Sequence, residues 1–187
     1  MKAEVTPSEA TAKRDATGPV ADQASSAWQV THARQVGTSL TSLLCFDIYA
    51  ASRALTRAYR PLLEPLGLTY PQFLVMLSLW EAEENVAVSG LPLTVGALGE
   101  RLSLDSGTLS PLLKRLESGG LVARERSRQD EREVTVLLTG AGRALEAQAA
   151  HVPGEIVRMV GLTDRERLAL QSTLRQMRVN VEAVSRP

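Results

Sequence analysis

The chain has 187 residues, which is long enough for one domain of ordinary size or for a compact domain with tails. Its 21 basic and 21 acidic residues balance, so bulk charge alone cannot drive binding to nucleic acid, and any basic surface must be local. A single cysteine excludes an intramolecular disulfide, and the lack of both a signal-peptide pattern and an apolar run of about 18 residues leads us to expect a cytoplasmic protein with no membrane partner.

The N-terminal segment differs in composition from the rest of the chain. The first 37 residues are rich in Ala, Thr, Ser, Asp and Lys and contain almost no large apolar side chains. Such a segment cannot bury enough surface to offset the entropy that ordering costs. We therefore predict a disordered tail over residues 1–37 and a folded domain over residues 38–187.

Two long helices are predicted at the start of the folded domain. An amphipathic pattern begins at Thr38 and runs to Pro61, where proline disfavours helical geometry in the residue before it. Thr69 has the side chain of an N-cap, and Pro71 stands in the opening turn of a second helix. We expect this second helix to end near Glu83.

A surface loop and two short helices are predicted next. Residues 84–92 are acidic at their start and contain Ser-Gly and Pro, which is typical of a loop. Thr94 is expected to cap the first short helix, and Asp105 or Ser106 is expected to cap the second. The Gly119–Gly120 pair is expected to end the second helix in left-handed geometry. The apolar side chains expected to face inward are Val95, Leu98, Leu102, Leu109, Leu112, Leu113 and Leu116.

The hydrophobic period changes after these helices. Residues 121–122 begin a short apolar strand, and the apolar side chains of residues 134–138 alternate along a second strand. The connection over residues 124–132 is polar and charged. This pattern predicts a β-hairpin with a basic tip.

Helices are predicted again from Thr139 onward. The first is interrupted near Pro153 and Gly154, and the run from Thr163 to Glu166 has the pattern of a capping box ahead of a final helix. That helix carries an apolar stripe that a small domain has little need for, so we expect it to pack against a second subunit. The stripe consists of Leu168, Leu174, Met177 and Val181.

The order of helix, tight turn, helix and charged hairpin is the layout of a winged helix-turn-helix. The predicted fold is mainly α with a small β-hairpin wing, and its DNA-binding part spans about 70–139. Ser106, Ser110 and Lys114 share the stripe opposite the leucines, where short side chains and a lysine can approach a DNA groove. Seven basic and five acidic side chains lie between residues 101 and 132, an excess that a symmetric dimer would double. A solvated helix face and a polar hairpin fit the same pattern, so both interpretations stay open here.

Several longer motifs narrow the choice. They are Leu-Cys-Phe at 44–46, Tyr49-Ala-Ala-Ser-Arg53, Tyr59-Arg-Pro-Leu-Leu63, Leu68-Thr-Tyr-Pro-Gln72, Leu104-Asp-Ser-Gly-Thr-Leu-Ser-Pro-Leu-Leu-Lys-Arg-Leu116 and Asp130-Glu-Arg132. In this order they resemble the organic-hydroperoxide-sensing repressors of the MarR family, and the likeness runs from about Leu40 into the final helix. The chain differs from that family in a longer segment between Trp80 and Leu98 and in Asp47, where an apolar residue is expected.

The resemblance implies a homodimeric, MarR-like repressor that is not an enzyme and has no cofactor or metal. It would leave its operator DNA when an organic hydroperoxide, the inducer, oxidises one cysteine. By matching position, Cys45 would be the redox-sensing thiol, with Tyr49, Tyr59 and Tyr70 as its hydroxyl neighbours. Arg132 would be the wing residue that reads the minor groove, and Asp130 would help to position the wing. The DNA-binding residues implied on the recognition helix and the wing are Asp105, Ser106, Thr108, Ser110, Lys114, Arg115, Arg128, Asp130 and Arg132.

Helix geometry adds a condition on the tyrosines. Cys45 and Tyr49 are four positions apart, so they share one stripe of the first helix. Tyr59 lies fourteen positions after Cys45, which is roughly 21 Å along a helix axis, so it cannot touch the thiol of its own chain. If Tyr59 acts on a cysteine, it does so across a dimer in which the two first helices lie near each other.

The fate of the oxidised cysteine follows from its being alone. No second cysteine is present as a resolving thiol, so a sulfenic acid at Cys45 must react with a small thiol, attack a backbone nitrogen or oxidise further. We expect a low-molecular-weight thiol to form a mixed disulfide that is too bulky for the DNA-binding arrangement.

Three other interpretations of Cys45 stay open. A buried cysteine often acts only as a small hydrophobe. A MarR-type regulator can instead respond to a reversible aromatic or phenolic ligand, with Cys45 merely lining the pocket. A thiol peroxidase would consume hydroperoxides catalytically, but the chain lacks a resolving cysteine and has a basic wing that such an enzyme would not need.

Overall fold

The computed structural model describes residues 39–89, 93–126 and 133–185. The predicted tail over residues 1–37 lies outside these ranges, as do the wing residues Arg128, Asp130 and Arg132. The chain divides into two compact units, Met1–Ala50 and Ala51–Pro187. The first unit contains a short 3-10 helix, η1 (Leu40–Ser42), and the opening turns of helix α2 (Leu44–Leu63), and the second unit contains the elements that follow.

The prediction for the first helix was wrong at both ends. Helix α2 begins at Leu44 instead of near Thr38, and it passes through Pro61 to Leu63. A proline so near the C-terminus removes only one backbone hydrogen bond, and the last turn is held by burial of Leu63, which is 1% exposed. A 3-10 helix, η2 (Glu64–Leu66), then ends at Gly67, whose φ of 67° is left-handed.

The prediction for the second helix was right at its start and wrong at its end. Helix α3 spans Tyr70–Ser89, so residues 84–89 of the predicted loop are helical, and residues 90–92 lie outside the described ranges. The acidic residues that suggested a loop are compatible with a helix, because neither glycine nor proline occurs between Glu84 and Ser89. Gln72 stabilises the N-terminus, since its Oε1 accepts hydrogen bonds from the backbone N (2.9 Å) and Oγ1 (2.8 Å) of Thr69.

The predicted helix-turn-helix is confirmed. Helix α4 (Val95–Leu102) has Thr94 as its N-cap, and helix α5 (Ser106–Ser118) has Asp105. Ser103 lies between the two helices in left-handed geometry, with a φ of 53°. At the end of α5 only Gly120 is left-handed, whereas Gly119 keeps a right-handed φ of −78°, so the prediction for the glycine pair was half right.

The hairpin is confirmed, with a longer first strand than predicted. Strand β1 (Val122–Arg126) pairs antiparallel with β2 (Val134–Leu138), in the register from Val122 opposite Leu138 to Arg126 opposite Val134. Residues 124–126, which were predicted to lie in the connection, therefore belong to β1. The hairpin also has a third partner that was not predicted. The backbone N of Val136 donates to the carbonyl of Leu93 (2.9 Å), and Thr94 forms a bridge with Thr135.

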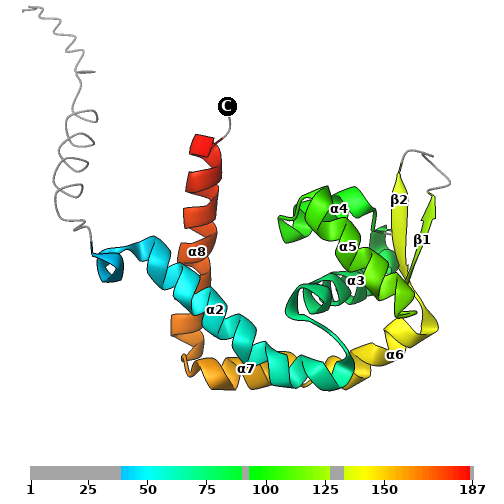
Figure 1. Cartoon of the computed structure of the whole chain (residues 1–187), viewed down its shortest axis with the longest axis horizontal. Helices are drawn as coiled ribbons and strands as arrows, with labels where there is room; N and C mark the ends of the chain where they lie inside the picture. The colour runs from blue at the N-terminus through cyan, green and yellow to red at the C-terminus, as the bar shows by residue number, and fades with distance from the viewer. Residues whose placement is uncertain (1–38, 90–92, 127–132, 186–187) are drawn as a thin grey trace, which may run out of the picture. The chain divides into compact units, whose positions relative to one another are not determined.

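One hydrophobic core holds the elements of the second unit together. Figure 1 labels the helices and the two strands of the hairpin. Helix α3 contacts α4, α5, β2 and α6, and α5 contacts both α4 and β1. The largest fully buried side chains of the core are Phe73, Leu63, Met76, Leu98, Leu109, Leu113, Leu116, Val75 and Val152. Three of these leucines, Leu109, Leu113 and Leu116, anchor α5 in the core, so the opposite face of this helix is exposed to solvent.

Three helices complete the chain: α6 (Gly140–Ala149), α7 (Val152–Val160) and α8 (Asp164–Ser185). The predicted interruption near Pro153 lies two residues earlier, because proline fits the opening turn of α7. The capping box before α8 is confirmed by hydrogen bonds in both directions between Thr163 and Glu166. Among the described residues, no single helix is long and apolar enough to span a membrane, although the bent pair of segments 44–66 and 70–84 passes that test by length and composition alone.

Candidate nucleic-acid interface and thiol site

The outward face of α5 presents the stripe that the sequence predicted. Leu109 and Leu113 are each 1% exposed and anchor the helix, whereas Ser106, Ser110 and Lys114 are exposed on the other side. Within the described part of the chain, no ion pair engages Lys114. The helix therefore offers two short hydroxyls and a cation at spacings of four residues, a set that suits a DNA groove.

Asp105 and Thr108 hold each other at the N-terminus of α5. Asp105 Oδ1 accepts a hydrogen bond from the backbone N of Thr108 (2.9 Å), and Oδ2 accepts one from its hydroxyl (3.0 Å). These two hydrogen bonds lower the pKa of the Asp105 carboxyl from its usual value, and the bond from the backbone N of Thr108 has the larger effect. Both side chains were predicted to be DNA-binding, and here they are engaged in capping the helix that carries the other groups.

Glu117 was not predicted to have a role, yet it binds one of the arginines of the hairpin. Its Oε2 accepts hydrogen bonds from Arg124 Nε (3.0 Å) and Nη2 (2.5 Å), and its Oε1 accepts one from the backbone N of Arg124 (3.2 Å). The hydrogen bonds from the Arg124 side chain are the main cause that lowers the pKa of Glu117. Arg115, Arg124 and Arg126 are all exposed, but within the described part of the chain only Arg124 of these three has its charge compensated by an ion pair.

The thiol lies in the first unit. Cys45 is free and exposed, in the first turn of α2, and Tyr49 follows one turn later with 59% of its surface exposed. The interpretation of Cys45 as a small hydrophobe buried within its own chain is therefore wrong. The helix also contains Tyr59, which confirms the premise that all three residues belong to one helix.

The other two tyrosines lie in the second unit and contact each other. The ring centroids of Tyr59 and Tyr70 are 4.5 Å apart, and Tyr59 lies 5.9 Å from the ring of Phe73. Burial raises the pKa of both phenols, and the neighbouring Tyr70 raises that of Tyr59 further. Both are therefore neutral hydrogen-bond donors at physiological pH, whereas their approach to Cys45 stays a prediction.

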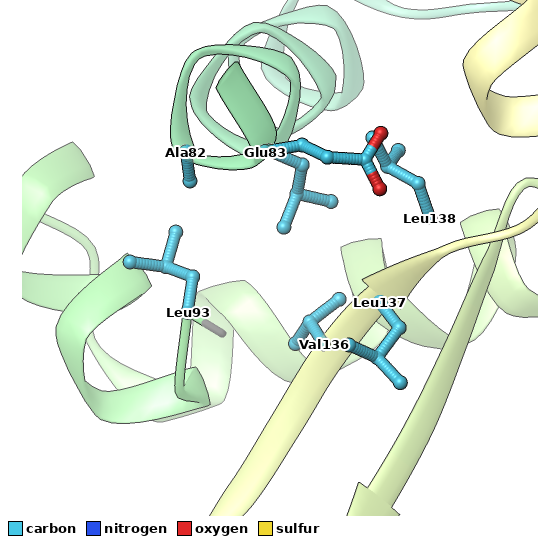
Figure 2. Close-up of a pocket in the computed structure, with 7 residues that line it drawn as sticks. Ala82, Glu83, Leu93, Val136, Leu137 and Leu138 are labelled. Atoms are coloured by element: carbon cyan, nitrogen blue, oxygen red, sulfur yellow. The ribbon is translucent and has the colours of Figure 1, made fainter. Parts of the chain in front are cut away.

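The second unit also contains several open hollows, two of which border residues described above. A small hollow of about 120 Å³ lies between α3 and β2. Figure 2 shows side chains that line it, with Glu83 as the charged one. The Glu83 carboxylate accepts hydrogen bonds from Arg143 Nε (2.8 and 2.9 Å). A larger hollow of about 520 Å³ is lined by Thr56, Arg60, Tyr70 and residues around them. No group of His, Cys, Asp and Glu that could hold a metal ion occurs among the described residues.

Known proteins similar to the chain are transcriptional regulators. A family model described as transcriptional regulator SarA/Rot matches residues 57–148. The HTH-type transcriptional regulator TtmR of Methylorubrum extorquens (strain PA1) is 50% identical over 145 residues, which cover 78% of this chain and 70% of that protein. The organic hydroperoxide resistance transcriptional regulator of Bacillus subtilis (strain 168) is 45% identical over 135 residues, 72% of this chain and 86% of that protein. The structure of reduced AbfR of Staphylococcus epidermidis bound to DNA has 33% identity and a TM-score of 0.61, and covers 83% of this chain and 98% of that one.

Proposed function

The chain belongs to the MarR family of DNA-binding, winged-helix transcriptional regulators, and from this premise we propose that it is a repressor that releases its operator when an organic hydroperoxide oxidises Cys45. The observation that carries the proposal is the single thiol, free and exposed in the first turn of α2, with Tyr49 one turn later. The Bacillus subtilis relative, whose name gives the inducer class, supports the same assignment.

Operator DNA is bound by α5 and the hairpin. Helix α5 enters the major groove with Ser106 and Ser110 near the bases, while Lys114 and Arg115 contribute the salt-dependent attraction to phosphates. Thr108 and Asp105 keep the N-terminus of this helix in place. Arg132, with Arg128 and Asp130 beside it in the sequence, reaches the adjacent minor groove. The exposed stripe of α5 supports this assignment, and the wing residues rest on the family pattern.

The repressor works as a symmetric homodimer. Apolar side chains on α7 and α8 stay exposed in the single chain, among them Val157 (45%), Leu168 (58%) and Val181 (58%). Exposed apolar surface on this scale marks an interface more often than a free surface. A dimer brings two recognition helices to two half-sites of one operator, and it supplies Tyr59 from the partner subunit to each Cys45.

Oxidation of Cys45 proceeds in two steps, through a sulfenic acid to a mixed disulfide. The Cys45 thiolate attacks the outer oxygen of an alkyl hydroperoxide, the O–O bond breaks, an alcohol leaves after taking up a proton, and the sulfur is left as sulfenic acid. A low-molecular-weight thiol then attacks this sulfur, which forms a mixed disulfide and releases water. Tyrosine hydroxyls suit the first step because they donate hydrogen bonds to the thiolate without adding a fixed charge.

A gel shift on the DNA upstream of the chain's own gene, with and without cumene hydroperoxide, tests this function. Wild-type chain should lose the DNA on addition of the peroxide, and Cys45→Ser should keep it.

The hollow beside Tyr70 favours a second candidate, a regulator that responds to a reversible aromatic ligand. Under that function Cys45→Ser would respond to its inducer as wild type does.

A further inference from the structure

One carboxylate joins the recognition helix to the first strand of the hairpin. Glu117 lies in the last turn of α5, and Arg124 is the third residue of β1. The carboxylate receives three hydrogen bonds from Arg124, one from its backbone amide and two from its guanidinium. Because both the main chain and the side chain are held, the position of the strand itself is fixed, and not only that of a flexible arginine.

The segment that joins Glu117 to Arg124 does not by itself fix the position of β1 at Arg124. Gly119 and Gly120 allow more backbone conformations than other residues. The turn itself is fastened near its base, where the hydroxyl of Thr139 donates to the carbonyls of Gly120 (2.6 Å) and Leu121 (3.2 Å). Beyond that point β1 lies at one edge of a two-stranded sheet, and the bond to Glu117 satisfies an amide at that edge.

We propose that Glu117 is a positioning residue for operator binding, which holds β1 at a set angle to α5 so that the helix and the hairpin engage the DNA together. Arg124 is its partner and not a phosphate contact. The inference rests on the proposed use of the hairpin in DNA binding. It assigns the angle between the hairpin and α5 to Glu117 and Arg124, which lie outside the tip of the hairpin.

Because Glu117 is negatively charged, this proposal and bulk electrostatics predict opposite changes in DNA affinity for Glu117→Ala. Removal of a carboxylate next to a DNA-binding surface makes the surface more positive, so bulk electrostatics predicts tighter binding of Glu117→Ala. Loss of the clamp predicts weaker binding of the same variant. Arg126 provides the matched control, because it is a second exposed arginine on β1, and within the described part of the chain it forms no ion pair.

The affinity of the full chain for a duplex of its own upstream DNA, at about 0.15 M salt, separates these explanations. Glu117→Ala and Arg124→Ala should each bind about tenfold more weakly, and the double variant should be no weaker than either single one, because both remove one interaction. Glu117→Ala combined with Arg126→Ala should instead show additive losses. Glu117→Gln, which keeps an acceptor for the Arg124 amide, should recover part of the affinity.

Two readouts show that the loss reflects the angle of the hairpin and not general instability. In a hydroxyl-radical footprint, Glu117→Ala should lose protection at the outer minor grooves and keep it at the half-site centres. Without DNA, hydrogen exchange at the Arg124 amide should be faster in Glu117→Ala, while the thermal midpoint stays near that of wild type. Wild-type binding of the upstream duplex is the check on the proposed function, and the exchange rate tests the clamp even if that binding fails. Equal or tighter binding by Glu117→Ala, additive losses with Arg124→Ala, or an unchanged exchange rate would overturn the proposal.

Discussion

Tyr59 and Tyr70 stack against each other, with ring centroids 4.5 Å apart and ring planes inclined by 34°. Tyr59 comes from α2 and Tyr70 begins α3, so the pair fastens the end of one helix to the start of the next. Phe73 continues the contact from Tyr59 toward Trp80, whose ring lies 6.3 Å from its own. Displacement of Tyr59 therefore bears directly on the core that supports the DNA-binding helices.

The stacked pair should show itself in an alkaline titration. Burial raises the pKa of both phenols, so their contribution to stability is complete below the ordinary tyrosine pKa of about 10 and is lost as the pH rises through the higher values of the folded chain. Tyr70→Phe should lower the pKa of Tyr59, because one cause of its rise is removed. The ultraviolet absorbance of tyrosinate measures this. Titration of Tyr59 at the same pH in wild type and Tyr70→Phe would contradict the coupling.

Gly142 should be intolerant of a side chain. A Cβ at this position would overlap the carbonyl oxygen of Leu121, which is backbone and cannot move aside, whereas nothing lies within 4 Å of a Cβ at Gly140. Gly142→Ala should therefore lower the free energy of unfolding by about 1–3 kcal/mol. Gly140→Ala should be neutral or raise it by up to about 1 kcal/mol. Urea denaturation followed by tryptophan fluorescence compares the two, and equal effects would rule out the predicted overlap.

These contacts show which parts of the structure were predictable. Local signals were read correctly: Thr94, Thr139 and Thr163 start helices because the stabilising partner lies three residues away in the sequence. The prediction for the end of α3 was wrong, because acidic residues occur in surface loops and in helices alike. Neither the third partner of the hairpin nor the bond between Trp80 Nε1 and the carbonyl of Gly142 (2.9 Å) has a sequence signal, because tertiary packing brings those groups together.

The same distinction holds for the candidate site. The stripe of α5 could be predicted from the period of its leucines, since burial of one face determines what the other presents. Arg124 was counted among the basic residues of the wing tip, and only the fold reveals that it is in β1 and bound to Glu117. Exposure of Cys45 could not be read from its apolar neighbours, because the same pattern fits a core and a subunit interface.

Lys114 should contribute to operator binding through phosphate charge. Lys114→Ala should reduce the slope of log affinity against log salt by about 1, because one fewer counterion is released on binding. Arg175→Ala removes an exposed positive charge from α8 and should leave the slope unchanged. Fluorescence anisotropy with a labelled duplex at several salt concentrations measures both. The same slope for wild type and Lys114→Ala would count against the docking of α5.

A charge on the apolar stripe of α8 should break the dimer. Leu174 is 39% exposed in the single chain, and burial of a glutamate there against a partner would be costly. Leu174→Glu should shift the chain toward monomer and abolish both operator binding and the response to peroxide. Gln176→Glu places the same charge on an exposed position away from all four residues of the stripe and should leave the dimer intact. Sedimentation velocity measures the oligomeric state, and a monomeric wild type would remove the basis for a sensing pocket shared between subunits.

The reactivity of Cys45 is the central claim, and one paired measurement tests it most directly. Wild type and Cys45→Ser are incubated with their upstream DNA, cumene hydroperoxide and a low-molecular-weight thiol, and each sample is divided between a gel shift and intact mass spectrometry. Wild type should release the DNA, and its mass should increase by that of one low-molecular-weight thiol joined through a disulfide. Cys45→Ser should stay bound to the DNA and keep an unchanged mass. Release of the DNA by Cys45→Ser, or release by wild type with an unmodified thiol, would contradict the account.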